Sequence, residues 1–133
     1  MNTITLPKKD KHIDELHFEH KLWSSEAKFY ADELMIYQNR LEEIAAKNSN
    51  HDVRKQISHF QNQFTIQRNE LDILNHEINE HEQWLSKYAK ENPIAIDKKL
   101  FANHETMSNR AAAFKRIHAE LKEEFMRFMA TWM

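Results

Sequence analysis

Apolar residues recur at alternating steps of three and four along three long segments of this 133-residue chain. The average step of 3.5 residues keeps one stripe of a helix, here called the seam, facing its neighbours in a left-handed supercoil. The seam comprises Ile13, Leu16, His20, Trp23, Ala27, Tyr30, Leu34, Tyr37, Leu41, Ile44; Val53, Ile57, Phe60, Phe64, Gln67, Leu71, Leu74, Ile78, His81, Leu85, Tyr88; and Leu100, His104, Met107, Ala111, Phe114, His118, Leu121, Phe125, Phe128, Trp132.

Two interior stretches interrupt this pattern, at residues 47–51 and 92–97. In the first, Asn48 suits a left-handed C-terminal cap, and Ser49 with Asp52 resembles a capping box that opens the next helix.

In the second stretch, Pro93 disfavours helical geometry at the preceding residue, and Asp97 is a good N-cap. We therefore predict three helices, at about residues 10–47, 51–91 and 97–132.

Short connections make neighbouring helices antiparallel, so the predicted fold is an all-α, up-down-up bundle with left-handed, coiled-coil-like packing. Residues 1–133 form one domain, and residues 1–9 are expected to be a flexible N-terminal arm. A four-helix bundle within one chain would need a break inside a segment, and none of the three segments contains Pro or Gly.

The composition excludes several classes of function. The chain has no Gly, which excludes the glycine-rich loops that bind phosphates and dinucleotides, and no Cys, which excludes disulfides and thiolate sites. A net charge of −2 offers no field that would attract nucleic acid. No apolar run is long enough to span a membrane, and we expect a cytoplasmic protein.

Nine histidines are the main compositional oddity, and several of them fall at one end of the predicted bundle. His17 and His20 are three residues apart, and Glu77 and His81 are four apart, so each pair shares a helix face. Imidazole and carboxylate at this spacing suit Zn²⁺ or another divalent ion, the only cofactor that the sequence suggests. The preferred interpretation of His20, His81 and His104 is that they are polar core residues that set the register.

Two other kinds of metal site fit the sequence poorly. A ferritin-like di-iron site needs Glu three residues before His, a spacing that is absent here. A hemerythrin-like pattern occurs once, at His76 and Glu80, and His76 lies off the seam.

The heights of residues along the bundle follow from the assumed turn centres. With turns near residues 49 and 95, His20 is expected opposite Ile78, and Ile78 opposite Ala111.

Large apolar residues also occur beside the seam, where a three-helix bundle faces outward. Exposed apolar surface that is contiguous usually marks a partner site. The residues concerned recur every seven positions, as Leu22, Phe29 and Ile36 in the first helix and Ile66 and Ile73 in the second.

We therefore expect a non-enzymatic bundle that acts through protein–protein interaction, with itself as the partner in a homodimer or small oligomer. The alternative is a bundle that responds to a divalent metal or to pH through its histidine-rich end. No catalytic residue is identified.

Overall fold

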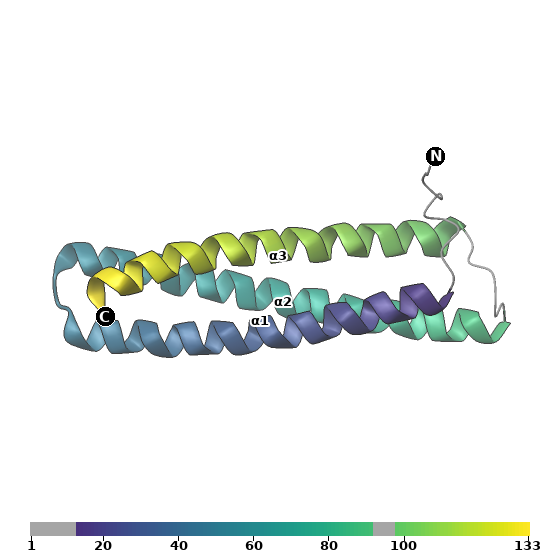
Figure 1. The fold of residues 1–133 in the computed structure, drawn as a ribbon, viewed down its shortest axis with the longest axis horizontal. Coiled ribbons are helices and arrows are strands. Elements are labelled where there is room, and N and C mark those ends of the chain that lie inside the picture. Colours follow the sequence, from purple (N-terminus) through teal and green to yellow (C-terminus); the bar gives the residue numbers. More distant parts are fainter. Residues whose placement is uncertain (1–12, 92–97) are drawn as a thin grey trace, which may run out of the picture.

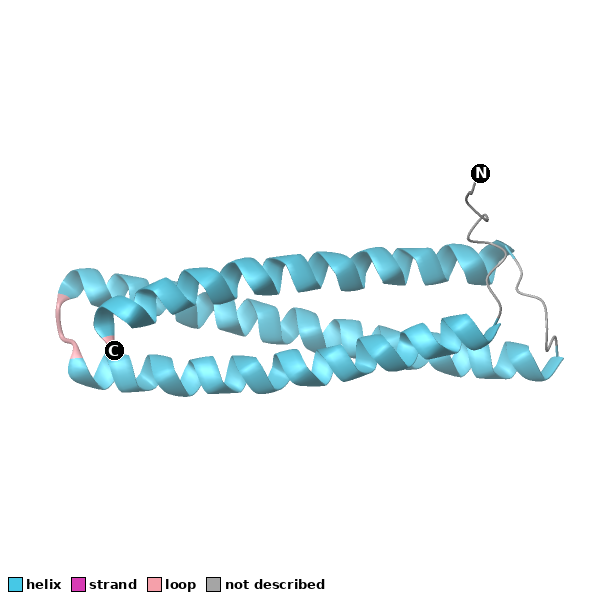
Figure 2. Ribbon diagram, viewed as in Figure 1, coloured by secondary structure: helices cyan, strands magenta, loops and turns pink. Residues whose placement is uncertain are grey.

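The structure, a computed structural model, describes residues 13–91 and 98–133. It consists of three helices, α1 (Ile13–Lys47), α2 (His51–Glu91) and α3 (Lys98–Trp132), which lie side by side along the long axis of the molecule (Figure 1). The described part of the chain contains no strand (Figure 2). The predicted all-α, up-down-up bundle of three long helices is confirmed.

The predicted ends of the helices agree with the structure wherever it describes them. The ends at residues 47 and 91 and the start at residue 51 are reproduced. The expected starts at residues 10 and 97, and the arm at residues 1–9, lie outside the described residues.

The connection between α1 and α2 is capped differently from the prediction. No described residue has a positive φ, so the left-handed cap expected at Asn48 does not form. Its side-chain Nδ2 instead donates to the carbonyl of Ile44 at 2.9 Å, which satisfies one of the open carbonyls of α1. Asn50, not Ser49, is the N-cap of α2, because its Oδ1 accepts from the backbone N–H of Asp52 at 2.8 Å.

The seam forms the core. All its members are buried except Tyr30, Ile57, Tyr88, Ala111 and Trp132, which are half-buried. Two apolar clusters result: a large one from Trp23 through the middle of the bundle to Phe128, and a small one of Ile13, Leu16, Leu85 and Leu100. The residues of the seam between these clusters are His20, His81 and His104, so a polar layer divides the core.

The heights of α2 and α3 relative to α1 differ from the expectation. His20 lies level with His104 and not with Ala111, seven residues further along α3. The mean residue number of two facing rings gives the centre about which the two helices are paired. This mean lies between 50 and 51 for Tyr37 with Phe64, and between 92 and 93 for Phe60 with Phe125. The assumed centres were residues 49 and 95. An error of one residue in a centre shifts the expected facing residue by two positions, and the errors of the two turns add.

None of the three helices contains a stretch long and apolar enough to cross a membrane, as far as the described residues go.

Candidate metal centre

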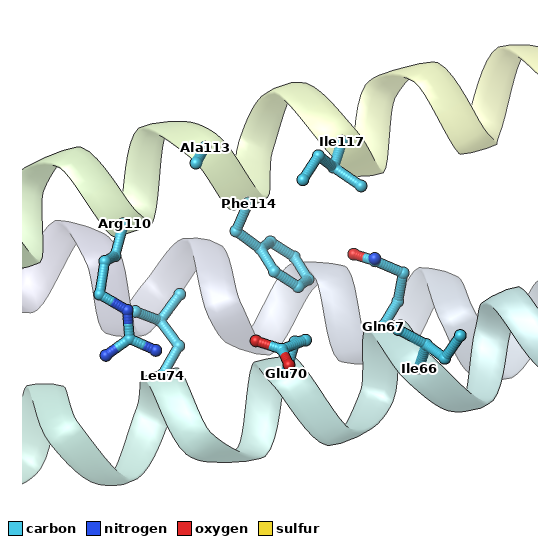
Figure 3. A pocket seen from close by; sticks show the side chains of 8 residues that line it. All are labelled: Ile66, Gln67, Glu70, Leu74, Arg110, Ala113, Phe114 and Ile117. Carbon is cyan, nitrogen blue, oxygen red and sulfur yellow. The ribbon is translucent and has the colours of Figure 1, made fainter.

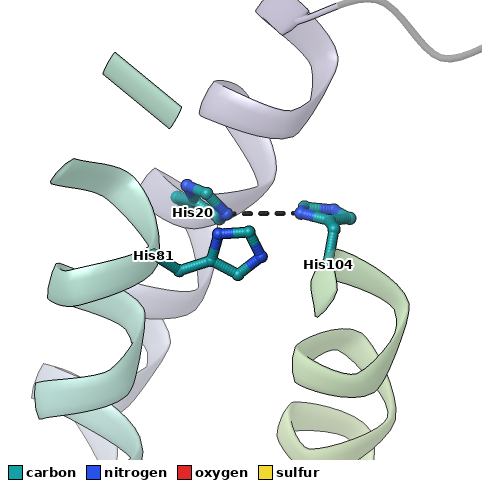
Figure 4. Close-up of side chains that lie close together, drawn as sticks. All are labelled: His20, His81 and His104. Carbon is teal, nitrogen blue, oxygen red and sulfur yellow. Dashed lines mark hydrogen bonds between the residues drawn. The ribbon is translucent and has the colours of Figure 1, made fainter. Parts of the chain in front are cut away.

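Three buried histidines, one from each helix, meet in the polar layer (Figure 4). His20 is 1% exposed, His81 6% and His104 0%. The imidazole ring of His20 lies 4.8 Å from that of His81 and 5.1 Å from that of His104, measured between centroids. One ring nitrogen of each histidine falls within 4.8 Å of the other two.

The closest approach in this cluster joins Nε2 of His20 to Nδ1 of His104, at 3.2 Å. In a tetrahedral Zn²⁺ site, bonds of 2.0–2.1 Å place neighbouring ligand nitrogens roughly 3.3–3.4 Å apart. These two nitrogens already have the separation that a shared ion requires. The longest side of the triangle is at most 4.8 Å, so His81 would have to move by about 1.4 Å or less to reach the same ion.

Carboxylates hold the outer nitrogens of the same two rings. Nδ1 of His20 lies 2.7 Å from Oε1 of Glu82, and Nε2 of His104 lies 2.7 Å from Oε1 of Glu19. An ionised carboxylate only accepts hydrogen bonds, so each of these imidazole nitrogens carries the hydrogen and donates it. This choice of tautomer leaves a lone pair on each inner nitrogen, Nε2 of His20 and Nδ1 of His104.

When both rings are neutral, Nε2 of His20 and Nδ1 of His104 therefore face each other as two hydrogen-bond acceptors. A hydrogen bond between them needs one ring to be an imidazolium, whereas a metal ion between them would use both lone pairs. Burial lowers the pKa of His20, and repulsion from positive charge on His81 and His104 lowers it further. The hydrogen bond that His20 donates to Glu82 raises the pKa, but the net shift is downward. The neutral form of His20, which is the form that binds metals, is thus favoured.

His81 completes the cluster with two ring nitrogens that have no hydrogen-bond partner among the described residues. A buried polar group without a partner costs about 1–3 kcal/mol, so an unpartnered imidazole inside a core is unusual. Its ring stacks on Trp84 at 5.6 Å, and the ring of Trp23 stacks on His104 at 5.0 Å. These aromatic contacts restrain the imidazoles without using their nitrogens.

The four residues predicted as metal ligands are placed in different environments. His20 and His81 lie together in the cluster. His17 instead pairs with Oε2 of Glu82, the carboxylate whose Oε1 binds His20. The side chain of His17 is partly exposed to solvent. Glu77 pairs with Arg110 of α3.

The ligand set predicted from the sequence does not include His104, and the sequence assigns no role to Glu19 or Glu82. His104 occupies a seam position, but the heights expected from the sequence place Ala111, and not His104, level with His20, an offset of about two helical turns. The sequence could have indicated Glu19 and Glu82, because they directly precede His20 and follow His81, respectively. A residue next to a seam position can reach across to an adjacent helix.

The residues predicted as an interaction surface are exposed, as expected. The exposed fractions are 46% for Leu22, 56% for Phe29, 53% for Ile36, and 49% each for Ile66 and Ile73.

Three of these residues line grooves of the bundle, and they do not share one groove. Leu22 and Phe29 line a groove of about 470 Å³ between α1 and α3. Ile66 lines a different groove, of about 340 Å³ between α2 and α3, with Ile117 on its opposite wall (Figure 3). No element on the described part of the chain covers either groove.

No protein-family model matches this sequence, and comparisons with curated proteins and with solved structures find no match.

Proposed function

We propose that this bundle binds one divalent transition-metal ion, of the type of Zn²⁺, through His20, His81 and His104. The observation that carries the proposal is the pair of inner nitrogens, 3.2 Å apart, whose rings both donate their only hydrogens outward to carboxylates. The binding atoms are Nε2 of His20, Nδ1 of His104 and one nitrogen of His81.

The outer carboxylates support this proposal. Imidazoles that bind metals commonly donate their other N–H to a carboxylate, which orients the ring and makes it a stronger ligand. Here Glu82 does this for His20 and Glu19 for His104. The two negative charges also balance the charge of a divalent ion held by neutral imidazoles.

The donor set indicates the class of metal. Three imidazole nitrogens suit Zn²⁺, Co²⁺, Ni²⁺ and Cu²⁺, whereas Mg²⁺ and Ca²⁺ prefer oxygen ligands. Because one ligand comes from each helix, the ion would join all three helices at the layer that interrupts the apolar core. An ion that binds only the folded state stabilises that state.

A titration of tag-free protein with Zn²⁺ tests the proposal. We expect one ion per chain and, at a free concentration 100 times the Kd, a stabilisation of about 2.7 kcal/mol, or a rise in Tm on the order of 10 °C. The variant His81→Leu should fold, because the imidazole it removes makes no hydrogen bond with any described residue, and it should lose the metal-dependent rise.

The matched control is His76→Leu. His76 is exposed and pairs with Glu80 on its own helix, away from the three-histidine cluster, so this variant should bind Zn²⁺ like the parent protein. Absence of saturable binding in the parent protein, or equal binding by His81→Leu, would contradict the proposal.

A second candidate function is self-association through α1. Leu22, Phe29 and Ile36 are spaced seven apart, so the stripe is symmetric about Phe29. In an antiparallel pair with two-fold symmetry, Phe29 would meet its counterpart and Leu22 would face Ile36 of the second copy. Leu22, Phe29 and Ile36 are each about half exposed, and burying their apolar side chains in the interface supplies the driving force for dimer formation.

A further inference from the structure

We infer that an ion held by His20, His81 and His104 keeps one coordination position for a small external ligand, which reaches it through the groove between α2 and α3. This inference rests on the proposed metal binding. It concerns the chemistry of the bound ion: a centre closed by protein ligands is structural, whereas an open centre exchanges ligands.

The number of donors leaves a position open. Zn²⁺ and Co²⁺ take at least four ligands in such sites. Within the described residues, no fourth His, Asp or Glu atom joins the three nitrogens of the cluster. The nearest carboxylates are already used, since Glu82 binds both His17 and His20, and Glu19 binds His104.

A route to the open position exists beside His81. Although it is only 6% exposed, His81 lines a groove of about 380 Å³ between α2 and α3. Asn103 and Thr106 of α3 line the same groove and offer polar groups beside it. The groove also contains the Glu77–Arg110 pair, so its wall carries both signs of charge.

The charges around the centre define the ligand. Three neutral imidazoles leave the ion with its two positive charges, and Glu82 and Glu19 offset them from the outer side. A nearly neutral centre selects small ligands with one donor atom, such as water or azide, over multiply charged anions. Exchange of one for the other changes no oxidation state.

The test uses Co²⁺-loaded protein, because the visible absorption of Co²⁺ reports its coordination. Azide should change this spectrum with saturation at one azide per ion. A spectrum that azide leaves unaltered, in protein that binds one Co²⁺, would overturn the inference while the proposed metal binding stands. Failure to bind Co²⁺ at all would overturn both.

Two variants test the route. Thr106→Trp places a large ring in the groove beside His81 and should weaken azide binding at least tenfold, with Co²⁺ stoichiometry unchanged. The matched control, Ser24→Trp, fills the groove of about 360 Å³ between α1 and α2 that His20 lines. Equal effects of both variants, or an effect of Ser24→Trp alone, would overturn the assigned route.

Discussion

Nε2 of His118 lies 2.9 Å from Oε1 of Glu33, which joins α3 to α1 in a second polar layer of the core. The other oxygen of Glu33 accepts hydrogen bonds from Nζ of Lys122 at 2.8 Å and from the hydroxyl of Tyr37 at 3.2 Å. His118 is 3% exposed, and its ring contacts those of Tyr30 and Phe114. One half-buried carboxylate therefore organises three polar groups from two helices.

This arrangement predicts a specific loss of stability in acid. Burial alone would raise the pKa of Glu33, but the hydrogen bonds from Lys122 and His118, with that from Tyr37, outweigh it and hold the pKa below its ordinary value. A depressed carboxyl pKa adds stability that is present above the unfolded pKa, about 4.3, and is lost as the pH falls through the folded pKa.

Glu33→Gln should remove that contribution. We expect a free energy of unfolding lower by about 1.5–3 kcal/mol at pH 7, from urea denaturation, and a shallower loss of stability below pH 4.3. The control is Glu43→Gln, which breaks the exposed pair with Arg40 and should cost no more than about 1 kcal/mol. Identical pH profiles for Glu33→Gln and the parent protein would refute this role.

A second prediction concerns the aromatic core near the α1–α2 connection. The rings of Phe60, Phe64 and Phe125 lie 5.0–6.1 Å apart and are at most 3% exposed. Phe64→Ala leaves a cavity that helices cannot easily close, and should lower the free energy of unfolding by about 3–5 kcal/mol. Phe18→Ala, at a position 66% exposed, should change it by no more than about 0.5 kcal/mol, and a comparable loss there would contradict the packing described.

The sequence predicted the fold well because the relevant physics is local. An unbroken step of three and four defines each helix and its buried face, and a chain without Gly leaves few places to turn. The N-cap of α2 is Asn50, one residue after the predicted Ser49, because both side chains can accept the capping hydrogen bond.

The candidate site was predicted less completely, since it depends on how helices slide past one another. Periodicity places His20 and His81 on buried faces but leaves the axial position of His104 open to an error of one heptad. The roles of Glu19 and Glu82 depend on contacts between helices, which side-chain spacing along one helix does not define.

Circular dichroism provides a direct test of the secondary structure. The helix content should be roughly four residues in five, far above the average of about one third in globular proteins. A measured content near that average, in folded protein, would be incompatible with three helices of the lengths observed here.

The last prediction concerns self-association through α1. Burial of a large apolar side chain contributes about 1.5–3 kcal/mol, and an association costs ~4–15 kcal/mol in lost freedom. Leu22, Phe29 and Ile36 are 46–56% exposed, so the six copies in a symmetric dimer would contribute about half of that value each, roughly 5–9 kcal/mol in total. This offsets the cost of association only near its lower end, so we expect a weak dimer that forms at high concentration.

Phe29→Glu should weaken this dimer, because it places two carboxylates against each other at the two-fold axis. Light scattering across a concentration series measures the effect. Met35→Glu is the matched control, since Met35 is equally exposed, at 57%, on the same helix but off the stripe. A parent protein that stays monomeric at high concentration would rule out this dimer. Equal weakening by both variants would show that Phe29 is not at the centre of the contact.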